Sequence, residues 1–127
     1  MRKEIRTAGA PAPVGPYSQA VEVNGILYIS GQIGIDPKTG QMPDHFKAQA
    51  EQVLANIYAI LKEAGYSKDN VVKITVYMVD LSKFKEFNDL YEDFFKDVEP
   101  KPARAVVGVN SLPLSAFVEV ETIAIKG

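Results

Sequence analysis

The stretch PARAVVGVNSLPLSAFVEVETIAI, residues 102–125, contains two runs rich in β-branched residues around a turn-like segment that includes Pro113. This pattern predicts two strands joined by a loop. The first run carries one cation, Arg104, and the second carries two carboxylates, Glu119 and Glu121. The two glutamates share a strand face because side chains alternate with a period of two. Whether Arg104 shares that face depends on the register, because a slip of one residue reverses it.

Arg104 is surrounded in sequence by alanine and valine, so we expect folding to remove part of its guanidinium from water. A desolvated charge without a partner is unfavourable, and an anion is therefore expected beside it. The candidates are Glu119, Glu121 and a bound ligand. On strand chemistry alone, an ion pair between neighbouring strands is the simpler interpretation, because cross-strand pairs of opposite charge are common.

The composition excludes several kinds of site. The chain has no cysteine, which rules out disulfides, thiolate metal sites and a cysteine nucleophile. The only histidine, His45, leaves no Ser-His-Asp triad and no multi-histidine cluster, so no metal site is predicted. The balance of 14 basic against 16 acidic side chains, without a block of either sign, makes nucleic acid an unexpected partner.

The length of 127 residues predicts a single domain, residues 1–127, with a core that needs no covalent staples. No apolar run is long enough to span a membrane, and no apolar segment follows the charged residues 1–6 as in a signal peptide. We therefore expect a cytoplasmic protein that does not enter the membrane.

The first part of the chain predicts an edge strand, a rigid loop and a hairpin. Residues 2–7 form a possible short edge strand, and residues 8–16, with three prolines and two glycines, predict an extended loop without ladder hydrogen bonds. The loop leads to Tyr17, which either packs on the sheet edge or contacts a ligand. The pair Asn24-Gly25 between apolar runs is typical of a type I′ hairpin turn.

The second hairpin strand runs into Ser30 and Gly31. A glycine inside a strand indicates a bulge or a close approach to the backbone. We favour the bulge, which could also direct the Gly31 N–H group and the Ser30 hydroxyl toward a ligand.

Two amphipathic helices are predicted. Apolar residues recur at helical spacing over residues 44–64, with Asp44 as a plausible N-cap and Gly65 in the position of a left-handed C′ residue. A second helix, residues 82–96, has an aromatic stripe beside Asn88, which would need a partner if it were buried.

Residues 71–79 form the strongest predicted strand and are largely apolar on both faces. The element order is strands, helix, strand, helix, strands, which predicts an α+β fold with both helices on one sheet face. The second apolar face is then expected to pack against other copies of the chain in a closed ring.

The sequence resembles the RidA family (also called YjgF/YER057c/UK114), the reactive-intermediate deaminases, along essentially its whole length. The resemblance rests on residues 15–19 (GPYSQ), 30–33 (SGQI), 88–91 (NDLY) and 102–104 (PAR), the last followed at the family's spacing by 118–121 (VEVE). It implies a chorismate-mutase-like α+β fold, a homotrimer, and active sites in clefts between subunits.

The resemblance also implies an activity: hydrolysis of 2-imino acids such as 2-iminopropanoate and 2-iminobutanoate, or their enamine tautomers, to 2-oxo acids and ammonia. No metal or cofactor is required, because an imine is already electrophilic at carbon and the site must only hold the acid, direct a water and move a proton. Arg104 matches the arginine that binds the substrate carboxylate, and Glu119 matches the catalytic glutamate that positions water and handles the proton. The positions that match other residues of the cleft, and are expected to bind substrate, are Tyr17, Ser30, Gly31 and Asn88.

One position departs from the family's pattern. Val106 stands where many members have a cysteine, so thiol chemistry attributed to relatives does not transfer to this chain. Two alternatives stay open: a non-catalytic binder of small 2-oxo or 2-amino acids, and an RNA-directed translation inhibitor, which the charge balance disfavours.

Overall fold

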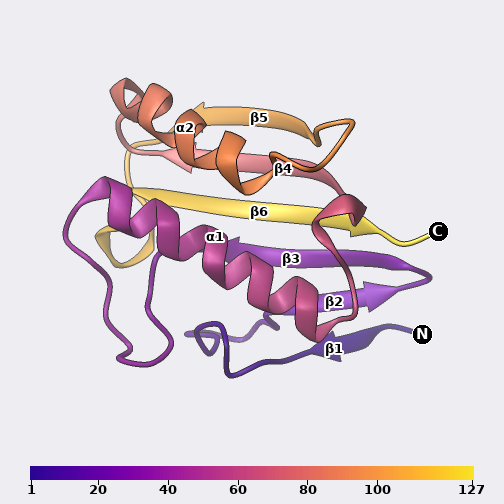
Figure 1. The fold of residues 1–127 in the computed structure, drawn as a ribbon. Helices are drawn as coiled ribbons and strands as arrows, with labels where there is room; N and C mark the ends of the chain where they lie inside the picture. Colours follow the sequence, from indigo (N-terminus) through magenta and orange to yellow (C-terminus); the bar gives the residue numbers. More distant parts are fainter.

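The chain forms one six-stranded mixed sheet with two helices on a single face (Figure 1). The structure is a computed structural model that describes residues 1–127. The strands lie in the order β1-β2-β3-β6-β4-β5, and every neighbouring pair is antiparallel except β4 and β5. The elements are β1 Lys3–Ile5, β2 Ala20–Val23, β3 Ile26–Gln32, α1 Phe46–Glu63, β4 Val71–Met78, α2 Phe84–Phe94, β5 Ala103–Gly108 and β6 Val118–Ile125. The predicted α+β class and the placement of both helices on one face are confirmed.

The β2–β3 hairpin turns at Asn24 and Gly25, whose φ angles of 51° and 77° are those that a type I′ turn requires. Further along β3, the pairing with β6 shifts register between Ile29 and Gln32. This irregularity confirms the predicted bulge around Gly31.

The ends of the helices differ in part from the prediction. The N-cap of α1 is His45, whose Nδ1 accepts from the Ala48 N–H group at 3.4 Å, so the prediction of Asp44 was wrong. His45 has the extended backbone of an N-cap, and Asp44 lies one residue too early to cap the first turn. Gly65, at φ 79°, follows the C-cap of α1 as predicted. A 3-10 turn, Leu81–Lys83, precedes α2, which therefore starts later than predicted.

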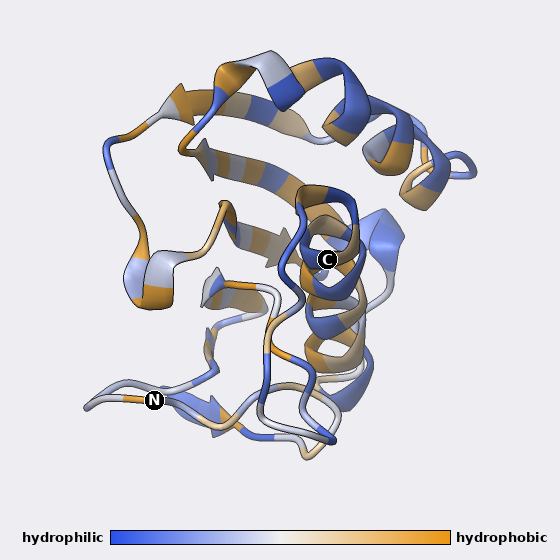
Figure 2. Ribbon diagram, turned by 90° about the vertical axis from the view of Figure 1, so that its left-hand side faces the viewer, coloured by the Kyte–Doolittle hydropathy of each residue, from blue (hydrophilic) through white to orange (hydrophobic).

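The core lies between the sheet and the helices, where 23 buried residues form one cluster. Ile74, Val76 and Met78 of β4 and Val118 and Val120 of β6 point into it. No helix covers the opposite face of the sheet (Figure 2). We call that face the open face; Tyr28, Val107 and Ile125 are among its apolar residues and are 46%, 40% and 45% exposed.

The two strands of the stretch 102–125 are not neighbours. β4 lies between β5 and β6, because β4, α2 and β5 form a parallel crossover unit at the sheet edge and β6 returns between β3 and β4. The interpretation of Arg104 and Glu119 as an ion pair between neighbouring strands is therefore wrong. Neither α1 nor α2 has the length and hydrophobicity of a membrane-spanning helix.

Candidate functional site

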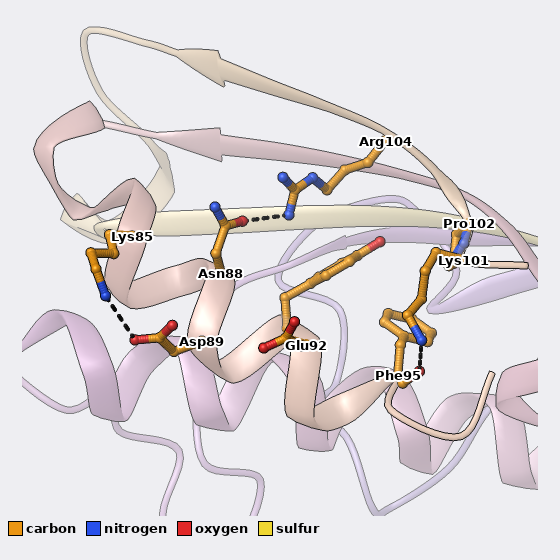
Figure 3. Close-up of a pocket in the computed structure, with 9 residues that line it drawn as sticks. Lys85, Asn88, Asp89, Glu92, Phe95, Lys101, Pro102 and Arg104 are labelled. Carbon is orange, nitrogen blue, oxygen red and sulfur yellow. Dashed lines mark hydrogen bonds and ion pairs between the residues drawn. The ribbon is translucent and has the colours of Figure 1, made fainter. Parts of the chain in front are cut away.

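Arg104 lies on the edge strand β5 and points to the helix face of the sheet. In the parallel ladder it pairs with Ile74, whose side chain is buried beneath the helices, and paired residues share a face. Its Nη1 donates a hydrogen bond to Oδ1 of Asn88 at 2.7 Å (Figure 3). The guanidinium carbon lies 4.7 Å from the ring centroid of Tyr91 and 5.5 Å from that of Phe84.

The three residues around the guanidinium come from one face of α2, because Phe84, Asn88 and Tyr91 are spaced by four and three positions. Asn88 is half-buried, and the partner of its amide oxygen is Arg104. The aromatic faces attract the cation without neutralising it. Tyr91 is 8% exposed and its hydroxyl has no hydrogen-bond partner. Burial raises the pKa of that hydroxyl, although Arg104 opposes the shift.

A hollow of about 600 Å³ opens over this arginine. Three cations line it, and two have a carboxylate partner: Lys85 with Asp89 at 3.7 Å and Lys101 with Glu99 at 2.7 Å. No carboxylate lies within 4.0 Å of Arg104. Its one side-chain hydrogen bond is to a neutral amide, which leaves most of its five N–H donors for an incoming acceptor.

Glu119 lies on the open face, against the bulge of β3. An added β-carbon on Gly31 would come within 2.5 Å of Oε2 of Glu119 and 2.8 Å of its carboxyl carbon. Burial raises the pKa of Glu119, and the negative charge of Glu121 raises it further. Arg104 of the same chain lies on the other face of the sheet and is not among the causes of this shift.

Ser30 and Tyr17 lie on the same side of the molecule as Gly31. The Ser30 hydroxyl donates to the Ser18 carbonyl at 2.6 Å, so its proton is used within the chain. Tyr17 and Gly31 line one small hollow of about 30 Å³ beside the proline-rich loop. Tyr17 is 47% exposed, and its hydroxyl oxygen accepts weakly from the Val14 N–H group at 3.4 Å.

The residues expected from the sequence thus form two groups on opposite faces of the sheet. Arg104 pairs with Ile74 of β4, whereas Glu119 pairs with Tyr77, three positions further along that strand. An odd separation along a strand reverses the face. One chain therefore brings Arg104 to Asn88 and Glu119 to Gly31, but does not bring the two groups together.

Sequence reasoning missed Gln49, a buried residue of α1. Its Oε1 accepts from the Phe117 N–H group at 2.8 Å and its Nε2 donates to the Pro43 carbonyl at 2.7 Å. It therefore anchors the chain two residues before Glu119. Its position three residues after Phe46, inside an apolar helical stripe, was the signal that could have identified it.

Together, the fold and the site define a class of small α+β proteins with a single mixed sheet, helices on one face and an unneutralised arginine over a hollow at the sheet edge. The family model described as Endoribonuclease L-PSP matches residues 7–126. The chain belongs to this family, the RidA/YjgF family that its motifs resemble.

Relatives match along nearly the whole chain. A RutC family protein of Aquifex aeolicus is 60% identical over 98% of this chain and 99% of its own length. The 2-iminobutanoate/2-iminopropanoate deaminase of Bos taurus is 48% identical over 100% of this chain and 92% of its own. The crystal structure of E. coli TdcF with bound serine has a TM-score of 0.94 and 37% identity, covering 98% of this chain and 99% of the other.

Proposed function

We propose that this protein hydrolyses 2-imino acids, 2-iminopropanoate and 2-iminobutanoate among them, to 2-oxo acids and ammonia. The observation that carries the proposal is the state of Arg104, the one cation lining its hollow without a carboxylate partner. A partly buried guanidinium in this state favours an anionic ligand. The deaminase name of the bovine relative, 48% identical, supports the same reaction.

In this proposal Arg104 holds the substrate carboxylate. A planar guanidinium can donate two parallel hydrogen bonds to a carboxylate, which orients the substrate as well as binding it. Asn88 keeps one edge of the guanidinium occupied, and Tyr91 covers its face. The remaining N–H donors would bind the carboxylate in one orientation, which fixes the direction in which the imine carbon of the substrate faces.

The reaction needs water at that carbon and a proton for the departing nitrogen. Water adds to the C=N carbon to form a carbinolamine, the C–N bond then breaks, and ammonia leaves as the C=O bond forms. Glu119 accepts a proton from the attacking water and returns it to the nitrogen, which completes the carbinolamine. It then moves the hydroxyl proton of the carbinolamine to the same nitrogen, so that ammonia can leave. Its raised pKa suits this exchange because the carboxyl group holds a proton more readily than an ordinary glutamate.

The two groups can act on one substrate only if a second copy supplies one of them, because Arg104 and Glu119 lie on opposite faces of the same sheet. We therefore propose a homotrimer in which Arg104 of one copy meets Glu119, Gly31, Ser30 and Tyr17 of the next. The exposed apolar side chains of the open face support such packing. Sedimentation of the purified protein as a monomer would contradict this arrangement.

The activity is tested by adding purified protein to a dehydratase that produces 2-aminoacrylate. We expect faster release of pyruvate and ammonia, and loss of this acceleration in Arg104→Ala. Arg6→Ala removes an arginine from the N-terminal edge of the molecule, outside this hollow, and is the matched control that should keep it. No acceleration by the wild-type protein would disprove the proposal.

A second candidate is a non-catalytic binder of small 2-amino or 2-oxo acids, which the bound serine of TdcF favours. Glu119→Gln separates the two candidates, because ligand binding at Arg104 should survive in both cases. Turnover by the wild-type protein that disappears in Glu119→Gln supports the enzyme. Binding without turnover in either protein supports the binder.

The family description names an endoribonuclease, which is why an RNA-directed activity also needs a test. The chain's mixed charges, 14 basic and 16 acidic, do not favour it. A ribonucleolytic activity that Arg104→Ala removes at physiological salt would overturn our preference.

A further inference from the structure

Tyr77 and Glu121 are two open-face residues next to Glu119. Glu119 and Glu121 are two positions apart on β6 and therefore point to the same face, roughly 7 Å apart along the strand. Tyr77 of β4 is the cross-strand partner of Glu119, yet its hydroxyl donates to Oε1 of Glu121 at 2.7 Å. The phenol therefore reaches diagonally past Glu119 to hold the second carboxylate.

Near Glu119, the other titratable groups of the same chain on this face make no comparable contact. The Arg104 that the proposed trimer brings to Glu119 belongs to another copy and is present in every variant compared below. Lys73 of β4 points to the same face but forms no ion pair within 4.0 Å. Tyr28 of β3 faces the same way, and its hydroxyl makes no hydrogen bond to another side chain. The residues of β5 on this face, Ala103, Ala105 and Val107, carry no charge.

Glu119 itself has little freedom on one side. Its carboxyl group lies against the backbone at Gly31, where even a β-carbon would not fit. It cannot move further toward β3, and Glu121 is the negative charge beside it on its own strand. Because Glu119 is confined on this side, the distance between the two carboxylates depends on where the exposed Glu121 side chain is held.

We propose that Tyr77 and Glu121 form a positioning pair for Glu119, in which the Tyr77 hydroxyl fixes the Glu121 carboxylate beside that of Glu119. A negative charge held there favours the protonated form of the Glu119 carboxyl group. The role in catalysis rests on the proposed function above, whereas the coupling between the carboxyl groups does not. Without the hydroxyl, the Glu121 side chain can sample several rotamers, and those that carry its charge away from Glu119 weaken the interaction between the two carboxyl groups.

The chemistry of the hydrogen bond is suited to this role. A hydroxyl that donates to a carboxylate also orients it, so Tyr77 holds the Glu121 carboxylate in one position. The same hydrogen bond raises the pKa of Tyr77, which keeps its hydroxyl protonated and able to donate. The pair therefore keeps the Glu121 carboxylate at one position relative to Glu119.

The test is a titration of the Glu119 carboxyl group by 13C NMR, with its signal assigned from Glu119→Gln. We expect Glu121→Gln to lower the titration midpoint by about 0.5 to 1 pH unit, as a charge roughly 7 Å away in a screened setting would. Tyr77→Phe should lower it by a smaller amount, and the double variant by no more than Glu121→Gln alone. Tyr28→Phe, which removes a hydroxyl from the same sheet face, should leave the midpoint unchanged.

The pH dependence of kcat/KM provides the functional readout. The pH at which kcat/KM changes through ionisation of Glu119 should fall most in Glu121→Gln and less in Tyr77→Phe. This holds whether the protonated or the ionised form of Glu119 is active. An unchanged Glu119 midpoint in Glu121→Gln, or equal and additive effects of Tyr77→Phe and Glu121→Gln, would overturn the inference. If the NMR shifts appear but no variant or wild type hydrolyses imines, the coupling stands and the proposed function fails.

Discussion

The carboxyl group of Glu119 lies in the space that a side chain at Gly31 would occupy. A β-carbon at position 31 would come within 2.5 Å of Oε2, closer than real β-carbons approach other atoms. The absence of a side chain in the bulge of β3 is therefore what allows Glu119 to pack on the sheet backbone. This contact joins two segments, residues 30–33 and 118–121, that are distant in the sequence.

Gly31→Ala should reduce turnover strongly with little loss of stability. The clash is with the end of a flexible side chain, so Glu119 can move away, and we expect a change in unfolding free energy of about 1 kcal/mol or less. Because Glu119 would then be misplaced, kcat should fall at least about tenfold. Thermal unfolding and steady-state kinetics on the same preparation measure both effects.

Gly34→Ala is the control for that prediction. A β-carbon there would come 2.7 Å from the backbone oxygen of Gln49 and 2.8 Å from its Cα, so helix α1 itself would have to shift. We expect a loss of about 1–3 kcal/mol in unfolding free energy, as for other overpacked sites. Similar stability losses in the two variants would show that Glu119 is not free to move away from position 31.

Asn88→Asp should weaken substrate binding. The change places a carboxylate where the amide oxygen now accepts from Arg104 at 2.7 Å, which would neutralise the guanidinium from within its own chain. We expect KM for the imino acid to rise at least about tenfold, and more than in Asn88→Ala, which removes the hydrogen bond without adding charge. A wild-type KM in Asn88→Asp would show that Arg104 does not bind the substrate carboxylate.

Glu119→Gln should change stability in a pH-dependent way. Burial and the charge of Glu121 raise the pKa of Glu119 above its usual 4.5, so folding favours the protonated form. That contribution is fully present below pH 4.5 and is lost as the pH rises through the raised pKa. Glutamine resembles the protonated form, so the variant should match wild type at pH 4 and exceed it at pH 8, by less than about 1 kcal/mol because water screens a half-exposed carboxylate.

Urea unfolding of both proteins at these two pH values, at one protein concentration, measures the difference. Glu51→Gln, on the exposed side of α1, is the control and should give the same difference at both pH values. A pH-independent effect of Glu119→Gln would mean that its carboxyl group is not desolvated in the folded protein.

Tyr91→Phe should be neutral or stabilising. The Tyr91 hydroxyl is buried without a partner, and removing an unsatisfied buried polar group relieves a desolvation penalty of about 1–3 kcal/mol at most. The ring would still cover Arg104, so KM should change less than twofold. Tyr91→Leu, which removes the aromatic face 4.7 Å from the guanidinium, is the comparison and should raise KM. A large rise in KM for Tyr91→Phe would reveal a contact between the hydroxyl and the substrate.

Features governed by neighbouring residues were predictable. The hairpin at Asn24 and Gly25 follows from the turn that these two residues favour, and the bulge at Gly31 follows from a glycine inside a strand. Prediction was weaker at the ends of the helices, where His45 rather than Asp44 caps α1. There the choice depends on which residue has extended backbone angles, and the composition of the first turn does not determine this.

Three features could be predicted because periodicity and motif spacing are local properties of the chain: the α+β class, the position of both helices on one sheet face, and Arg104 and Glu119 as candidate residues. The placement of those two residues relative to each other depends on the tertiary structure. Inserting β4 between β5 and β6 separates them, and the register of the two ladders points them to opposite faces. Strand order and register depend on contacts between distant segments, and a register shift of one residue reverses the face to which a side chain points. No local sequence pattern could therefore have predicted that Arg104 has no anionic partner in its own chain.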